Sequence, residues 1–260
     1  MCSSDLKPQT PNPKPQTPNP VLYLEIDKLS NIGMKLLKTG NGLDSSRTIL
    51  YNYFRSSPSW RVRIMLSLKH IDYEYHSIDI LAKEQRTPEF LAINPSGRVP
   101  ALWIDGYMLT ESMSILEYLE ETRKDPIKLL PDSPADRAVV RRICEHVNSS
   151  MHPMQNRRVI DRIQAEYKGD KVEWVSYWNK LGHDALEKML SQTAGTYAVG
   201  DSLTLADLFV YPQMFNGIQR FGLRKDDYTH LKRVFDNLFR LSEFRNAEPE
   251  KQKDSRIRHK

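Results

Sequence analysis

The chain of 260 residues has few cysteines and no long apolar run, and each absence excludes a class of protein. Cys2 and Cys144 form neither a disulfide framework nor a CxxC motif, and the histidines lack ligand spacing, so we expect reduced thiols and no metal site. No segment approaches the ~18 apolar residues of a membrane-spanning helix. The longest early run, residues 21–26, is also too short for the core of a signal peptide. We therefore expect a cytoplasmic protein without a membrane partner.

An excess of charge of one sign is missing from the body of the chain. The formal net charge is +5, but residues 48–244 contain equal numbers of basic and acidic side chains, and the excess lies in the two ends. A nucleic-acid binder needs a basic face to meet phosphates, so we expect no nucleic-acid partner. Hydrophobic residues make up 39% of the chain and charged residues 27%, which is typical of a globular protein.

The composition divides the chain into four parts. Residues 1–47 begin with the repeat KPQTPNP, which occurs twice over residues 7–20, and proline at this density favours an extended, disordered segment. A Pro-rich docking ligand is the alternative for this segment, and Met34 is an alternative start. Residues 48–128 form the first expected domain and residues 132–245 the second. Residues 246–260 read as a charged tail.

The first domain alternates between the periods of strands and helices. Apolar and β-branched runs predict strands at 48–53, 73–78, 99–104 and 107–109, and helices at 57–68, 88–93 and 112–121. Asp105-Gly106 is a two-residue turn of the kind that closes a hairpin. A strand, a crossover helix and a second strand imply a parallel pair, and the hairpin adds an antiparallel edge. The sequence therefore predicts a small mixed sheet with helices on its faces.

The second domain shows only helical patterns. Ser133-Pro134 opens one helix, and apolar residues from Trp174 to Met189 recur at spacings of three and four in another. Thr204 with Asp207 three residues later is a capping-box-like start to a third helix over 205–215, and a fourth spans about 230–241. We expect an all-α domain.

Three segments place polar groups where a ligand can meet them. Ser56, Ser57 and Pro58 lie between a strand and a helix, where the unpaired N–H groups and the helix dipole can steady an anion or a thiolate. Pro100 opens a strand and, if cis, exposes the backbone of Val99 to an extended ligand. Glu111 and Ser112 begin another helix. Taken singly, each segment is better explained by helix capping or by an ordinary strand-starting proline.

Together these segments resemble the glutathione transferases, and among them the zeta class. The resemblance covers roughly residues 48–254. Its most specific part is SSPSWRVRIMLSLKHIDYEY at 56–75, which is close to the zeta signature SSCxWRVRIAL. Further agreement lies in INPSGRVPAL at 93–102, TESMSILEYLEETR at 110–123 and TYAVGDSLTLADL at 196–208.

The resemblance implies a fold, a cofactor and a site. The fold is a thioredoxin-like α/β domain that holds glutathione, followed by an all-α domain, and the assembly is a homodimer. Ser56 would hold the glutathione sulfur as thiolate with Ser57 beside it, and Arg220 would engage a substrate carboxylate. The other residues that the resemblance assigns to glutathione binding are Pro58, Ser59, Trp60, Arg61, Gln85, Val99, Pro100, Glu111, Ser112, His152 and Asn156.

The implied reaction is the glutathione-dependent cis–trans isomerisation of maleylacetoacetate to fumarylacetoacetate in phenylalanine and tyrosine catabolism. Arg55, Arg61, Arg157 and Arg158 are further candidates to hold the dicarboxylate substrate. One alternative is a transferase that conjugates or dehalogenates small electrophiles such as α-halo acids. A second alternative is a non-catalytic interaction module with the same fold.

Two positions depart from the family pattern. Pro58 stands where the SSC triplet has cysteine, and proline also removes a first-turn N–H. We expect weakened or altered turnover and not its loss, because the first serine of the triplet, here Ser56, is the main partner of the thiolate in the family. His152 stands where glutamine is usual.

Overall fold

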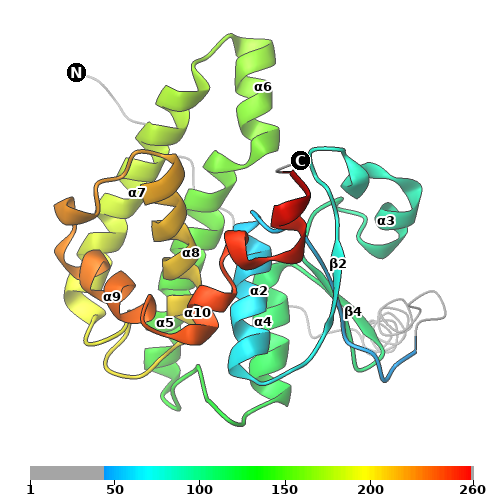
Figure 1. Ribbon diagram of the computed structural model, residues 1–260. Helices are drawn as coiled ribbons and strands as arrows, with labels where there is room; N and C mark the ends of the chain where they lie inside the picture. The colour runs from blue at the N-terminus through cyan, green and yellow to red at the C-terminus, as the bar shows by residue number, and fades with distance from the viewer. Residues whose placement is uncertain (1–43, 259–260) are drawn as a thin grey trace, which may run out of the picture. The chain divides into compact units, whose positions relative to one another are not determined.

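The computed structural model describes residues 44–258 (Figure 1). The predictions of a disordered Pro-rich segment, of a docking ligand and of a start at Met34 fall on residues 1–43, outside the described residues. The described chain begins with four strands interleaved with helices and continues through helices alone.

The sheet is small and mixed, as the sequence predicted. Its strands are β1 (Ile49–Asn52), β2 (Glu74–Ser77), β3 (Ala101–Ile104) and β4 (Tyr107–Thr110), in the order β2-β1-β3-β4. β1 is parallel to β2, while β1–β3 and β3–β4 are antiparallel. The β3–β4 turn places Asp105 and Gly106 at φ of 54° and 80°, the left-handed region that a tight hairpin turn of this type requires.

Alternation along the strands gives the sheet two buried faces. Leu50 and Leu102 belong to the core shared with α2 (Ser57–Leu68) and α4 (Ser112–Thr122). Their neighbours Ile49 and Trp103 form a separate cluster with Phe90 of α3 (Pro88–Ile93). Helices therefore cover both faces, and α2 and α4 begin at the same edge of the domain (Figure 1).

The second half is helical, as predicted. Its helices are α5 (Pro134–Glu145), α6 (Arg157–Tyr167), α7 (Lys171–Thr193), α8 (Leu205–Arg220), α9 (Thr229–Leu238) and α10 (Ser242–Asn246). A π-helical turn, η2 (His146–Met151), and a 3-10 turn, η3 (His152–Gln155), join α5 to α6, and short 3-10 turns occur at η1 (Glu84–Arg86) and η4 (Lys225–Asp227). α8 is buried along most of its length and contacts α2, α5 and α9.

Helix α6 is absent from the sequence prediction. None of its residues is buried, so it carries no stripe of core residues by which sequence periodicity could identify it. It lies beside α7 at the upper end of Figure 1 and brings its first turn to the cavity described below.

The expected charged tail is largely wrong, because the chain beyond residue 246 docks on the first domain. Residues 249–258 form two 3-10 turns, η5 (Pro249–Lys251) and η6 (Lys253–Arg258), which lie beside α2 and β2 (Figure 1). The buried Asp254 carboxylate accepts hydrogen bonds from the Phe54 N–H and the Ser77 hydroxyl, both at 3.0 Å, and from the Tyr75 hydroxyl. The charge count of this segment could not show these specific partners.

Within residues 44–258, no helix combines the length and the apolar character needed to cross a membrane.

Candidate active site

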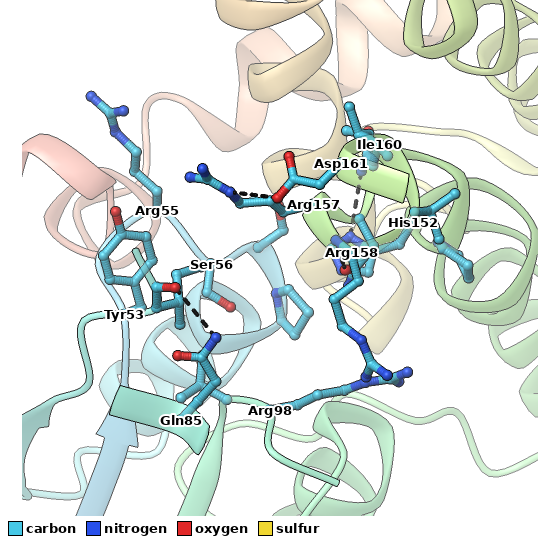
Figure 2. Close-up of a pocket in the computed structure, with 18 of the residues that line it drawn as sticks. Tyr53, Arg55, Ser56, Gln85, Arg98, His152, Arg157, Arg158, Ile160 and Asp161 are labelled. Carbon is cyan, nitrogen blue, oxygen red and sulfur yellow. Dashed lines mark hydrogen bonds and ion pairs between the residues drawn. The ribbon is translucent and has the colours of Figure 1, made fainter. Parts of the chain in front are cut away.

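A cavity of about 1090 Å³ lies where the two halves of the described chain meet. The amino-terminal ends of α2, α4 and α6 contribute to its wall, together with the end of α8. Figure 2 shows Ser56 near the centre of this cavity, with Gln85 and Arg98 on one side and the first turn of α6 on the other. The sequence predicted residues from each of these segments, and the structure brings them together.

Ser56 is the N-cap of α2 and faces the cavity. Its Oγ accepts a hydrogen bond from the Ser59 N–H at 3.3 Å, so the capping interpretation holds. A capping oxygen can still donate its own hydrogen, and the Ser56 side chain is only partly buried on the cavity wall. Capping and ligand contact are therefore compatible. Pro58 lies in the first helical turn, also on the wall.

Ser57 is tied to the helical half by Asn216 of α8. The Asn216 amide donates to the Ser57 Oγ at 2.9 Å and to the Pro212 carbonyl at 2.9 Å. Its carbonyl oxygen accepts from Arg220 Nη1 at 3.4 Å. Asn216 thereby connects the predicted substrate arginine with the serine pair, although 159 positions separate it from Ser57.

The strand-opening segment and Gln85 form the floor beside Ser56. The Val99–Pro100 peptide bond is cis, and both residues line the cavity. Gln85 also lines it, donates from Nε2 to the Ile80 carbonyl at 3.3 Å, and leaves a buried Oε1 without a partner among the described groups. Such an orphaned acceptor fits a ligand that offers an N–H group.

Glu111 and Ser112 present opposite chemistry side by side. Glu111 precedes α4 with φ of 64°, a rare conformation for a residue other than glycine, and its exposed side chain caps no helix N–H. Ser112 is buried to 3% exposure and opens the helix, where first-turn N–H groups favour an anion. A carboxylate beside an anion site matches the ammonium and carboxylate of an amino-acid head group.

Cationic side chains line two sides of the cavity without a carboxylate partner in the described chain. Arg55 and Arg220 lie on one side, where desolvation, followed by the charge of Arg55, lowers the pKa of Arg220. The second group consists of Arg86, Arg98 and Arg158, and desolvation, followed by the charges of Arg86 and Arg98, lowers the pKa of Arg158. The side chains of Arg98 and Arg158 converge in Figure 2.

The remaining predicted residues on the η3–α6 wall have defined partners. Arg157 forms an ion pair with Asp161 at 3.1 Å, and Asn156 caps α6 by accepting from the Arg158 N–H at 3.0 Å. Desolvation, together with Arg61, Arg98 and Arg220, lowers the pKa of His152 to about 3. His152 is therefore neutral near pH 7, and its Nδ1 lies 3.4 Å from Gln155 Nε2.

Three residues of the predicted set do not reach the cavity. Ser59, Trp60 and Arg61 each have 0% exposure, because α2 is buried on nearly all of its sides. Trp60 contacts Tyr211 and Phe215 edge to face. The prediction that these three side chains contact glutathione directly is therefore wrong. Arg61 does not contact a substrate directly either.

Sequence patterns missed two polar residues of the site, Asn148 and Asn216. Each lies in the helical half and lines the cavity. A lone amide on a helix gives no motif, so only the pairing of distant segments identifies it. Gln155 is held by reciprocal bonds with Gln213 at 2.7 and 3.3 Å.

The chain supplies no reactive thiol or clustered metal ligands in its described part. Cys144 is buried, and desolvation raises the pKa of its thiol. No group of three or more histidine, cysteine or acidic residues within residues 44–258 could hold a metal ion. Within residues 44–258, no cysteine can supply a thiolate at Ser56.

A thioredoxin-like sheet, an all-helical second half and a cavity between them define a protein of the glutathione S-transferase type. The family model for the glutathione S-transferase N-terminal domain matches residues 46–121, and that for a C-terminal domain matches residues 179–250. The first match falls on the half of the described chain that holds the sheet, and the second falls on part of the helical half.

Individual relatives narrow the assignment. Maleylacetoacetate isomerase of Mus musculus is 41% identical over 82% of this chain and 97% of its own length. The zeta-class glutathione S-transferase of Euphorbia esula is 45% identical over 79% of this chain and 92% of its own. The chain belongs to the zeta class of the glutathione S-transferase family.

A solved structure carries a ligand in the corresponding fold. Maleylacetoacetate isomerase from Anaeromyxobacter dehalogenans 2CP-1, with glutathione bound in the active site, superposes with a TM-score of 0.74 at 41% identity. The match covers 82% of this chain and 100% of that chain. A second structure of that isomerase, 40% identical with a TM-score of 0.73 over 82% of this chain and 99% of its own, holds dicarboxyethyl glutathione and citrate in the active site.

Proposed function

We propose that this protein is a glutathione-dependent isomerase that converts maleylacetoacetate to fumarylacetoacetate. The observation that carries the proposal is one cavity that joins a serine-capped helix N-terminus, the adjacent Glu111 and Ser112, and arginines without a carboxylate partner among residues 44–258. The named relatives are enzymes of this activity or class.

Glutathione fits the groups that the cavity offers. Glu111 and Ser112 would hold the ammonium and carboxylate of its γ-glutamyl end, and Val99 would pair with its cysteinyl backbone. The orphaned Gln85 Oε1 would accept an N–H of the peptide. These assignments place the thiol at Ser56, the residue on the wall that caps α2.

Glutathione, when bound, supplies a thiolate that adds to the conjugated double bond, lets the resulting single bond rotate and then leaves, so no atom is gained or lost. The Ser56 hydroxyl donates to the sulfur, and the N-terminus of α2 adds a positive potential, so the ionised thiol is favoured near neutral pH. Pro58 offers no N–H to that sulfur, so Ser56 carries more of this task than in a chain with cysteine there.

The two arginine groups favour a substrate with two carboxylates. Arg55 and Arg220 form one cationic pole, and Arg98 and Arg158 with their neighbour form the other. Like charges held together without a carboxylate repel each other, and a bound anion relieves that repulsion. Maleylacetoacetate carries one carboxylate at each end and can meet both poles.

The test is the isomerisation of maleylacetoacetate with and without glutathione. We expect turnover only with glutathione, and we expect Ser56→Ala to lower kcat/KM on the order of 100-fold through loss of the thiolate donor. Ser67→Ala, in the last turn of the same helix, is the control that should leave turnover unchanged. Absence of isomerisation by the wild-type protein at saturating glutathione would overturn the proposal.

The two poles are tested by comparing maleylacetoacetate with maleylacetone, which has one carboxylate. Replacing Arg98 and Arg158 together by Gln should lower kcat/KM for the dicarboxylate about tenfold and spare maleylacetone, because only one substrate reaches the second pole. Arg162→Gln is the control, since Arg162 already pairs with Glu166 at 2.8 Å. Equal losses on both substrates would show that the second pole holds no carboxylate.

The same thiolate site also supports conjugation or dehalogenation of small electrophiles. Dichloroacetate supplied with glutathione separates the two activities: turnover of dichloroacetate alone would reverse the ranking. A calorimetric titration in which glutathione does not bind would instead favour a non-catalytic module.

We also propose that the protein forms a homodimer and works in the cytoplasm. Large exposed apolar side chains on α6 and α7 support association: Tyr167 is 69% exposed, Val172 66%, Tyr177 61% and Leu181 49%. Light scattering should give twice the mass of one chain, and Tyr177→Glu should shift the equilibrium towards the monomer. Cell fractionation would test the location.

A further inference from the structure

Two arginines of α2 are buried to the same degree but are satisfied very differently. Arg63 is 2% exposed, and its Nε, Nη1 and Nη2 all donate, to Ala247, Asn52 and Phe54, at 2.9–3.1 Å. Arg61 is 0% exposed, and its Nε and Nη2 have no partner in the described chain. Arg63 therefore has a structural role. The hydrogen bonds of Arg61, by contrast, do not offset the free-energy cost of burying its charge.

The one bonded nitrogen of Arg61 reaches two residues that line the cavity. Nη1 donates to the Ser112 Oγ at 3.1 Å and to the Asn148 Oδ1 at 2.7 Å. Ser112 opens α4, and Asn148 lies on the π-helical turn that faces it. Arg61 thus lies one layer behind the cavity wall, with its guanidinium plane over the Phe209 ring at 4.1 Å.

These two hydrogen bonds fix the orientation of the Asn148 amide and the Ser112 hydroxyl. A guanidinium has no acceptor, so the amide of Asn148 must turn its oxygen to Arg61 and its NH2 group away. The Ser112 oxygen likewise accepts from Arg61, which frees its hydrogen to donate elsewhere, and no described group accepts it. Both residues therefore offer donors towards the cavity.

The guanidinium of Arg61 forms no ion pair in the described chain, although the Glu145 carboxylate acts on it electrostatically. Desolvation lowers the pKa of Arg61 to about 9, so the guanidinium stays charged near pH 7, and the raised pKa of Cys144 keeps that thiol neutral. A buried cation behind two aligned donors fits an anion on their open side.

We propose that Arg61 and Asn148 are positioning residues for the α-carboxylate of the γ-glutamyl group. Asn148 and Ser112 donate to that carboxylate, and Arg61 orients both of them and supplies the opposite charge from behind. This inference rests on the proposed use of glutathione and adds a residue, Asn148, and a buried cation to its recognition.

The α-carboxylate is the expected ligand group because the ammonium on the same carbon also has a partner in the cavity. Glu111, held at positive φ directly before Ser112, offers a carboxylate for the ammonium on the same carbon. The first-turn N–H groups of α4, a helix of 11 residues, point at the same place. An α-amino-acid head presents both charges this close together.

The experiment compares glutathione with γ-aminobutyryl-cysteinylglycine, which lacks only the α-carboxylate in question. Calorimetry gives the Kd of each peptide for the wild type and for Asn148→Ala, Arg61→Met and the control Arg63→Met. We expect Asn148→Ala and Arg61→Met to weaken glutathione binding about tenfold and to leave the Kd of the analogue nearly unchanged. Arg63→Met should lower the melting temperature but keep the wild-type ratio of the two Kd values.

Each outcome decides between the proposal and its failure. Equal weakening of both peptides, or no weakening of either, would overturn the role of Arg61 and Asn148 while leaving glutathione binding intact. A wild-type protein that binds neither peptide would overturn the proposed function and this inference with it. If Arg61→Met does not fold, Asn148→Ala decides alone, because Asn148 is partly exposed on a helical turn.

Discussion

At the residue scale, the site divides into side chains that a local pattern identifies and side chains that only the fold brings in. Ser56, Glu111 and Ser112 stand at helix starts, and a helix start is visible in sequence. Asn216 reaches Ser57 across 159 positions and Asn148 reaches Arg61 across 87, so no local signal marks either amide. The motif also included Arg61 as a direct contact, because a linear pattern does not show which face of the helix each residue occupies.

The contacts of Pro58 alone do not show how this residue affects turnover. Pro58→Cys restores both a first-turn N–H and a thiol on the cavity wall, so we expect kcat to rise several-fold through better stabilisation of the bound thiolate. Steady-state rates with maleylacetoacetate measure it. Pro134→Cys, at the exposed first turn of α5, is the control for losing a helix-opening proline. Equal rates for wild type and Pro58→Cys would show that the substitution does not affect catalysis.

His152 gives a prediction about pH. Desolvation and three arginines lower its pKa to about 3, so the imidazole is already neutral at pH 5 and stays neutral above it. The pH profile of kcat/KM should therefore show no step from His152 between pH 5 and 8. His152→Gln, which introduces the residue usual in the family, should leave the shape of that profile unchanged. A step near pH 6.5 that disappears in the variant would contradict the assignment.

At the element scale, the start of α8 shows that the surroundings of a predicted helix cap can increase its contribution to stability. The sequence identified Thr204 and Asp207 as a capping pair, for which replacement of Asp207 costs about 1 kcal/mol. In the structure, the Asp207 carboxylate has 0% exposure and accepts from the Thr204 N–H and the Ala198 N–H, both at 2.8 Å, and from the Thr204 hydroxyl at 3.2 Å. The hydrogen bond from Ala198 connects the preceding loop to the start of α8, and it is not part of the capping-box motif.

We therefore expect Asp207→Ala to lower the free energy of unfolding by about 2–4 kcal/mol, because two buried N–H groups lose their acceptor. Chemical denaturation measures this value, and the Kd for glutathione should stay within about twofold, since Asp207 does not line the cavity. Asp170→Ala at the exposed start of α7 is the matched control and should cost about 1 kcal/mol. Equal losses in the two variants would show that burial adds nothing to this cap.

The same carboxyl should give a pH signature. Desolvation raises the pKa of Asp207 from 3.8 to about 6, so the folded state holds this proton more tightly than the unfolded state. The stability that Asp207 contributes is therefore fully present below about pH 4 and falls as the pH rises to about 6. The difference in unfolding free energy between wild type and Asp207→Ala should narrow over this range and stay constant above it. A difference that widens from pH 4 to 6 would contradict the raised pKa.

At the scale of the whole molecule, the two halves of the described chain are joined by polar contacts that composition did not reveal. By sequence, residues 246–260 read only as a charged tail, yet Gln252, Asp254 and Ser255 are buried. Arg63 and Asp254 hold the loop before Ser56 from two sides, through the carbonyl and the N–H of Phe54. The fold class followed from strand and helix periods, whereas this closure depends on pairs of residues up to 200 positions apart.

The last prediction concerns that closure. Asp254→Ala removes the acceptor of the Phe54 N–H and of the Tyr75 and Ser77 hydroxyls, so we expect a loss of about 1–3 kcal/mol in the free energy of unfolding. Because Phe54 lies two residues before Ser56, the loop should also become more mobile, and the KM for glutathione should rise several-fold. Hydrogen exchange of the Phe54 amide together with steady-state kinetics measures both effects. Glu250→Ala, an exposed change in the same segment, is the control, and an unchanged exchange rate at Phe54 in Asp254→Ala would show that the C-terminal segment does not hold this loop.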